Sequence, residues 1–292
     1  MSGPIDPKEL TIRPLRREEL DLAMRWAADE GWNPGPHDAE VFWRADPEGF
    51  LGSFAPDGRL MASGSIVSYE GHYGFMGLFI VRPGHRGRGI GTPLWLHRRD
   101  ALRARLRPGA AIGMDGVFAM QSWYARGGFR LTHRNLRFEG TAPVGSFRDD
   151  TLVPLGELPL DEVLAHDTRH FGCERRAFLT RWLELPGSLA LASRVDGRIV
   201  GSGCIRPTQD GWKIGPLFAD TPDLGETLFR ALCDRTAGEP IQLDVPECHP
   251  AALALVRRHG WREVFGCARM YHGPPPAIPW ERVYGITTFE LG

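Results

Sequence analysis

The sequence predicts an α/β protein with a mixed sheet (α+β mixed), built as two tandem domains of similar design. Short apolar runs typical of strands alternate with segments whose apolar residues recur at helical spacing. The stretch DGRLMASGSI at 57–66 aligns without gaps on DGRIVGSGCI at 196–205. Two further pairs follow in the same order: GLFIV (77–81) with GPLFA (215–219), and YARGGF (124–129) with VRRHGW (256–261). Matches in the same order indicate an internal duplication.

The first half is expected to begin with a strand and two helices and to continue as a mixed α/β unit. Strands are expected at 11–15, 49–55, 60–69, 75–81 and 110–115, and helices at 17–30, 39–45, 92–106 and 119–126. The stretch 141–151 holds Gly, Pro and Ser and shows little periodicity. We therefore expect a first domain over 1–145 and a second over 146–292.

The composition is that of a globular protein, with 292 residues, 42% of them hydrophobic and 24% charged. A net charge of −1 creates no field that would attract nucleic acid or an anionic membrane, so neither is an expected partner. No apolar run reaches the length of a membrane span, and residues 1–10 do not read as a signal peptide. The five cysteines are odd in number and form no Cys-x-x-Cys pair, which indicates free thiols. A cytoplasmic protein is expected.

A glycine-rich stretch, RPGHRGRGIGTPLW at 82–95, follows the apolar run 75–81 and precedes an expected helix. A Walker A loop would need a lysine, and none is near. A dinucleotide-binding turn would need its third glycine at the position of Thr92, whereas the last glycine comes one residue earlier. The pattern that remains is Arg-x-x-Gly-x-Gly, formed by Arg86, Gly89 and Gly91.

This pattern, after a strand that ends in Val-x-Pro at 81–83, resembles the acyl-CoA signature of the GCN5-related N-acetyltransferases, the GNAT superfamily. The resemblance implies that acetyl-CoA is the acyl donor and that no metal is required. Bare glycine backbone and the positive end of the following helix suit a pyrophosphate. The residues implied in cofactor binding are Phe79, Ile80, Val81, Arg86, Gly87, Arg88, Gly89, Ile90, Gly91 and Thr92.

The resemblance also implies a tyrosine, on the helix after the next strand, that protonates the CoA sulfur. Tyr124 takes that place, and a phenol stays protonated at neutral pH. For the base, Asp115 at the end of the neighbouring strand is the first choice, and it can equally anchor the substrate ammonium. Glu70 and His72 on the preceding hairpin come next. Many members of the family carry Asn before the tyrosine, where this chain has Trp123.

The turn DEGWNPG at 29–35 lies where the family lines its acceptor site. Glu30, Trp32 and Asn33 offer a charge, an aromatic face and an amide to a cationic substrate, and Glu70 completes the expected substrate-binding set. Together with GMDGVFAMQSWYARGGF and the closing YGITTFELG, this turn resembles a YitH-like bacterial subgroup of tandem GNAT proteins. That resemblance implies an acetyltransferase domain followed by a second GNAT-like domain.

The second half differs where the chemistry is expected. Its loop at 220–225 is short and carries Asp220 and Asp223, which would repel a phosphate. Val256 stands where the first half has Tyr124. The second domain is therefore expected to be degenerate and not catalytic. His166, His170 and Cys173 lack the spacing of a zinc site and are interpreted as a helix face.

These observations favour an N-acetyltransferase that moves the acetyl group of acetyl-CoA to a primary amine, a small molecule, by direct attack. Two alternatives stay open at this point. One is a non-catalytic sensor or regulatory module that binds acetyl-CoA, and the other is a protein lysine acetyltransferase. A homodimer is also left open.

Overall fold

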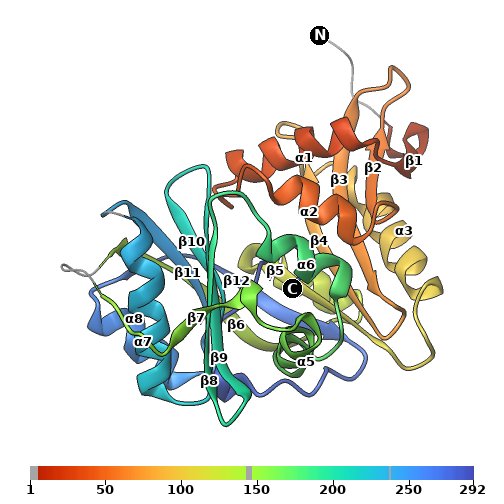
Figure 1. Ribbon diagram of the computed structural model, residues 1–292. Helices are drawn as coiled ribbons and strands as arrows, with labels where there is room; N and C mark the ends of the chain where they lie inside the picture. Colours follow the sequence, from red (N-terminus) through yellow and green to blue (C-terminus); the bar gives the residue numbers. More distant parts are fainter. Residues whose placement is uncertain (1–5, 143–146, 237) are drawn as a thin grey trace.

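A computed structural model describes residues 6–142, 147–236 and 238–292. Within these residues thirteen strands form one mixed sheet in the order β1-β2-β3-β4-β5-β12-β6-β11-β10-β9-β8-β7, and β13 pairs with β10 off this path. The two halves of the chain lie beside each other, and the C-terminus lies between them (Figure 1). The predicted α/β class with a mixed sheet is confirmed.

The first half follows the expected order, and each expected element begins and ends within two residues of its predicted bounds. Its elements are β1 (Thr11–Pro14), α1 (Arg17–Asp29), α2 (Asp38–Ala45), β2 (Phe50–Phe54), β3 (Leu60–Tyr69), β4 (Tyr73–Val81), α3 (Gly91–Ala104), β5 (Ala111–Val117), α4 (Gln121–Arg126) and β6 (Arg130–Thr141). The apolar spacing predicted these elements because it marks buried faces: α1 buries Leu20, Ala23, Met24 and Ala27, which recur every three to four residues.

The second half repeats this order. Its elements are β7 (Leu152–Pro154), α5 (Leu160–Phe171), α6 (Arg176–Leu183), β8 (Leu189–Val195), β9 (Arg198–Pro207), β10 (Trp212–Ala219), α7 (Pro222–Cys233), β11 (Pro240–Pro246), α8 (Pro250–Arg258), β12 (Arg262–His272) and β13 (Val283–Gly285). The aligned stretches 57–66 and 196–205 both enter the second strand of a hairpin, β3 in one half and β9 in the other.

The strand order is symmetrical about its centre, and the last long strand of each half is exchanged. β6 of the first half pairs with β11 of the second, and β12 of the second half pairs with β5 of the first. β6 and β12 also pair with each other, antiparallel, at the middle of the sheet. Neither half therefore completes its sheet with its own strands. The expected boundary at 145/146 lies outside the described residues.

The halves also share a hydrophobic core on one face of the sheet. One core cluster contains Leu20 and Phe42 from the first half together with Phe178 and Trp182 from α6. The rings of Phe42 and Trp182 stack with their centroids 6.4 Å apart. This packing fixes α2 against α6 and holds the two halves in one arrangement.

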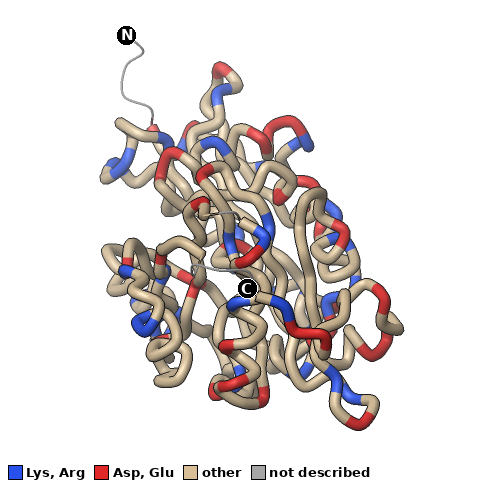
Figure 2. Tube along the Cα trace, turned by 60° about the vertical axis from the view of Figure 1, so that its left-hand side comes forward, with Lys and Arg blue, Asp and Glu red and all other residues tan. Residues whose placement is uncertain are grey.

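Charged residues of both signs are spread along the whole trace, and neither sign gathers on one side (Figure 2). In the part of the chain that the structure describes, no helix has both the length and the apolar character needed to cross a membrane.

Candidate active site

The central strands β4 and β5 separate partway along their length. They pair in parallel only where Tyr73–Met76 faces Ala111–Met114. Just beyond, the pairing of β4 with β3 shifts by one residue, and Leu78 adopts a positive φ of 48°. This is a β-bulge, which turns backbone groups out of the ladder, and a left-handed leucine is a strained position of the kind that occurs at functional sites.

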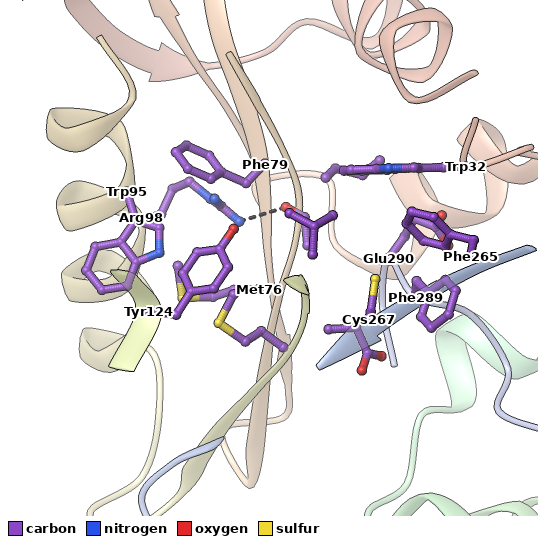
Figure 3. Close-up of a pocket in the computed structure, with 15 residues that line it drawn as sticks. Trp32, Met76, Phe79, Trp95, Arg98, Tyr124, Phe265, Cys267, Phe289 and Glu290 are labelled. Carbon is purple, nitrogen blue, oxygen red and sulfur yellow. Dashed lines mark hydrogen bonds between the residues drawn. The ribbon is translucent and has the colours of Figure 1, made fainter. Parts of the chain in front are cut away.

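A narrow cavity of about 40 Å³ lies at this separation. Figure 3 shows two groups of side chains that face each other across it. Tyr124, Arg98, Trp95 and Phe79 stand on one side, and Trp32, Phe265, Cys267, Phe289 and Glu290 on the other. The first group comes from the first half, whereas most of the second comes from β12 and the C-terminal segment, defined here as residues 283–292. Both halves therefore build one site.

Tyr124, the expected acid, lies on the wall of this cavity with 4% of its surface exposed. Its ring packs directly on Gly116 of β5. A Cβ at Gly116 would lie 2.5 Å from Cε2 of Tyr124, so only glycine leaves room for the ring. Burial raises the pKa of the phenol to about 12, although the nearby Arg98 cation opposes this shift. Tyr124 therefore carries its proton throughout the neutral range and can donate it inside the cavity.

Arg98 of α3 is a buried cation on the same wall, and the sequence analysis did not single it out. Its Nη2 donates to the carbonyl of Gly77 at 2.7 Å and to that of Ser65. Its Nε and Nη1 have no partner among the described residues, and burial lowers its pKa to about 9. Because a trans peptide points its carbonyl and its N–H in opposite directions, this bond turns the Leu78 N–H away from Arg98. An arginine on the apolar face of the predicted helix was the signal that could have revealed it.

The glycine-rich loop connects β4 to α3 as expected. Gly87 and Gly89 have φ of 73° and 78°, values that glycine adopts without strain. Gly91 begins α3 so close to β4 that a Cβ would lie 2.7 Å from Cγ2 of Val81. Among the described residues no side chain caps the first turn of α3, and that turn contains no acidic residue. The Thr92 N–H donates to the Gly89 carbonyl at 3.2 Å and Pro93 has no N–H, so the donors suited to an anion are the N–H groups of the loop glycines and of Gly91.

The side chains of the other expected cofactor-binding residues divide into exposed and buried ones. Arg88 and Thr92 are exposed beside the loop, whereas Ile80 and Ile90 are buried and offer only backbone. Arg86 donates through Nε to the Val81 carbonyl at 3.0 Å and pairs with Glu30. The expected substrate residue Glu30 thus contacts the glycine-rich loop and is not among the residues that line the cavity.

Asp115, the first choice for the base, forms a buried ion pair with Arg269 of the exchanged strand β12. The guanidinium donates to Oδ1 at 2.9 Å and to Oδ2 at 2.6 Å, and Asn135 donates to Oδ1 at 2.9 Å. The second half contains the same arrangement: Asp244 of β11 accepts from Arg137 of β6 at 2.7 and 2.9 Å. The same pair in both halves indicates that Asp115 and Asp244 join the exchanged strands. The assignment of Asp115 as the base stays a prediction.

The remaining residues expected to bind the substrate lie at three different places in the structure. Trp32 lines the cavity. Asn33 is 6% exposed and its amide donates to Thr208, to Gln242 and to the Asp210 carbonyl, so it anchors the turn to the second half. Glu70 and His72 are exposed in the turn before β4, at the end of that strand opposite the glycine-rich loop, and neither lines the cavity.

The corresponding separation in the second half is filled by the chain itself. β10 pairs with β11 only over Trp212–Ile214, and beyond that point β13 pairs with β10. Ile286 extends this contact, because its N–H donates to the Asp244 carbonyl of β11 at 3.0 Å. Pro216, aligned with Leu78, has no N–H to offer. The ring of Tyr284 also lies 2.8 Å from the place of a Cβ on Gly225 in the first turn of α7.

The start of α7, which corresponds to the start of α3 after the glycine-rich loop, offers fewer free N–H groups to an anion. The Thr221 hydroxyl accepts from the Leu224 N–H at 3.3 Å, Pro222 lacks an N–H, and Asp223 lies in the first turn of α7. The described residues contain no group of three or more His, Cys, Asp or Glu side chains placed to hold a metal ion. Instead, His166 bonds Ser202 at 3.0 Å, and His170 bonds the His166 carbonyl at 2.8 Å.

The duplicated fold, the separated central strands and the glycine-rich loop define the class of protein, and comparison with known families agrees. Residues 15–129 match the Acetyltransferase (GNAT) family, and residues 163–285 match an Acetyltransferase (GNAT) domain. The chain belongs to the GNAT superfamily, carries two such domains in tandem, and is an acyltransferase. The predicted superfamily and tandem arrangement are confirmed.

Two relatives are similar over nearly the whole chain. The holothin acyltransferase of a Pseudoalteromonas species is 29% identical to this chain, and the alignment covers 97% of this chain and 94% of the relative. The uncharacterized N-acetyltransferase YitH of Bacillus subtilis is 24% identical, and the alignment covers 95% of this chain and 97% of YitH. Among solved structures, a putative acetyltransferase from Pyrococcus horikoshii has a TM-score of 0.81 at 24% identity, covering 98% of this chain and 96% of its own. A tandem GNAT protein from the clavulanic acid biosynthesis pathway has a TM-score of 0.62 at 14% identity, covering 92% and 100%.

Proposed function

We propose that the chain transfers the acetyl group of acetyl-CoA to the primary amine of a small molecule by direct attack, in the cytoplasm. The observation that carries this proposal is the position of Tyr124, a protonated phenol on the wall of a cavity that opens where β4 and β5 separate. The aromatic side chains of Trp32, Phe265 and Phe289 across the cavity from Tyr124 support a small amine as the acceptor. Five free cysteines, four of them buried, support a reducing compartment.

The loop 82–91 would hold the pyrophosphate of acetyl-CoA. Its glycine N–H groups, including that of Gly91 at the start of α3, supply donors, and Arg86 and Arg88 supply positive charge. The pantetheine arm would extend along β4 toward the bulge, where the Leu78 and Phe79 N–H groups are the candidate donors to the thioester carbonyl. Such donors stabilise the negative charge that develops on the carbonyl oxygen during attack.

Tyr124 would then protonate the departing thiolate. Arg98 supports this step, because its buried cation favours negative charge on the sulfur and on the phenolate that remains. The second half has closed both the strand opening and the helix start, so it would shape the acceptor side of the site and would bind no second acetyl-CoA.

Replacing Tyr124 by Phe tests the role of the phenol. We expect kcat to fall about 10- to 1000-fold, the range of an acid–base group, while the Kd of acetyl-CoA changes little. Release of free CoA with a panel of small amines measures the rate, and calorimetry measures the affinity. Unchanged turnover would remove Tyr124 from the reaction. Tight binding of acetyl-CoA with no transfer to any amine would favour the sensor alternative.

A further inference from the structure

Glu290 of the C-terminal segment lies on the cavity wall across from Tyr124 (Figure 3). It is 4% exposed, and its backbone carbonyl packs so closely on Gly77 that no side chain would fit there. The Tyr69 hydroxyl donates to the neighbouring Leu291 carbonyl at 2.7 Å and fixes this part of the segment against β3. Glu290 is therefore held at the acceptor side of the site by the backbone on both sides of it.

The carboxylate of Glu290 differs from the other carboxylate on the cavity wall. Asp115 is fully engaged by Arg269 and Asn135. By contrast, across 6–142, 147–236 and 238–292 no side chain forms an ion pair or a hydrogen bond with the Glu290 carboxylate. A buried carboxylate without a partner is unfavourable unless it is protonated or meets a cation. An ionised Glu290 would therefore be stabilised by positive charge, either from neighbouring side chains or from a ligand in the cavity.

The charged groups around Glu290 come from four elements. Arg137 (β6), Arg206 (β9) and Lys213 (β10) favour its ionised form, and Asp38 (α2) opposes it. Two of the cations have carboxylate partners elsewhere, because Arg137 pairs with Asp244 and Arg206 with Asp38.

Lys213 is the cation that remains. Its Nζ donates to the carbonyls of Trp32 and Asn33 at 3.1 and 2.9 Å, and burial lowers its pKa to about 7. Burial also raises the pKa of Glu290. Burial thus disfavours the charged form of both groups, whereas their mutual attraction favours it. A carboxylate whose pKa is raised is a stronger base than an exposed one, so Glu290 is suited to accept a proton.

The side chains beside Glu290 on this wall are aromatic. Trp32, Phe265 and Phe289 line the cavity, and the rings of the two phenylalanines meet edge to face with centroids 5.8 Å apart. Aromatic faces attract organic cations through their quadrupole. Rings beside the one carboxylate of this wall that has no side-chain partner suit a small ion with one positive charge, a primary alkylammonium.

We infer that the Glu290 carboxylate binds the acceptor as its alkylammonium ion and then takes one of its protons, an inference that rests on the proposed acetyl transfer. One N–H bond breaks and an O–H bond forms on Glu290, which leaves a neutral amine. The amine forms the C–N bond to the thioester carbon, and the C–S bond breaks as the thiolate takes the proton of Tyr124. The second proton lost from nitrogen returns to Tyr124, and Glu290 releases its proton after the amide leaves.

Two amines of similar shape and different basicity test this role. At pH 7 ethylamine is a cation, whereas 2,2,2-trifluoroethylamine is largely neutral and needs no base before attack. We expect Glu290→Gln to lower kcat/KM for ethylamine at least about 100-fold, with a much smaller loss for trifluoroethylamine and an unchanged Kd for acetyl-CoA. Glu290→Asp should retain part of the rate with ethylamine. Glu263→Gln, the same change at an exposed site on β12, should have no effect.

No loss, or an equal loss for both amines, would overturn the inference while leaving the proposed acetyl transfer in place. A binding measurement covers the opposite case. In calorimetry, ethylammonium should bind to the unmodified protein and not to Glu290→Gln, and ethanol should bind to neither. If no amine is acetylated, the proposed function fails, and the binding measurement alone then tests the ammonium site. Ethylammonium binding that persists in Glu290→Gln would overturn the role of Glu290 in that site.

Discussion

Asp115 and Asp244 show how a single residue type can serve the sheet at two related positions. Each aspartate lies on the fifth strand of its half and faces an arginine on the strand exchanged from the other half. Both pairs are bidentate and buried, so each arginine donates two bonds into a region with little water. Losing one partner of such a pair leaves the other charge buried and unpaired, which is more costly than losing both.

The change Asp115→Asn should therefore lower the free energy of unfolding by about 3–5 kcal/mol, because Arg269 loses its counter-charge. Urea unfolding followed by circular dichroism measures this. Replacing both partners, as in Asp115→Leu with Arg269→Leu, should restore much of the stability. A variant Asp115→Asn that is as stable as the unmodified protein but inactive would instead support the original assignment as a base.

The position of Asp115 at a strand end could be predicted from the sequence, but its partner could not. Arg269 lies 154 residues further along the chain. The pairing exists only because β12 is inserted beside β5, and no local pattern of apolar residues encodes which strands become neighbours. Glu290 and Arg98 were missed for a related reason: each is a lone charged residue in an apolar stretch, and its significance appears only when the cavity is assembled.

At the scale of elements, apolar periodicity predicted the strands and helices of the first half well because each has one clearly buried face. The sequence also showed that the second half has the short segment 220–225 in place of the glycine-rich loop, and in the structure the helix that follows it begins with a side-chain cap. The prediction did not anticipate β13, three residues that close the gap between β10 and β11. A strand this short has no periodicity to recognise, and its place depends on the separation of two other strands.

Helix α5 gives a prediction at this scale, because its buried face carries His166. Burial lowers the pKa of this imidazole to about 3, whereas in the unfolded chain the pKa is near 6.5. Between these values the unfolded state binds the additional proton, so stability falls as the pH drops from about 6.5 toward 3, by about 1.4 kcal/mol per pH unit. The change His166→Gln should reduce this slope by that amount. Urea unfolding at pH 4, 5 and 6 measures it, and parallel curves for the two proteins would contradict the assignment.

At the scale of the whole molecule, two related halves have become unequal parts of one site. The exchanged strands bring β12 and the C-terminal segment of the second half to the cavity wall across from Tyr124. The same segment first fills the gap beside β10 in its own half, where β13 pairs with β10. Further along, its Glu290 carbonyl packs against Gly77 of the first half. The divergence of the two halves therefore accounts for both the single glycine-rich loop and the composite wall of the cavity.

The number of acetyl-CoA molecules bound per chain tests this account most directly. Isothermal titration calorimetry should give one site per chain. Gly89→Val should abolish binding, because valine does not adopt the φ of 78° at that loop position without strain. Gly197→Val, a matched change at a φ of 76° in a hairpin turn of the second half, should leave the stoichiometry at one. Two equivalent sites per chain, or one site that survives Gly89→Val, would contradict the account.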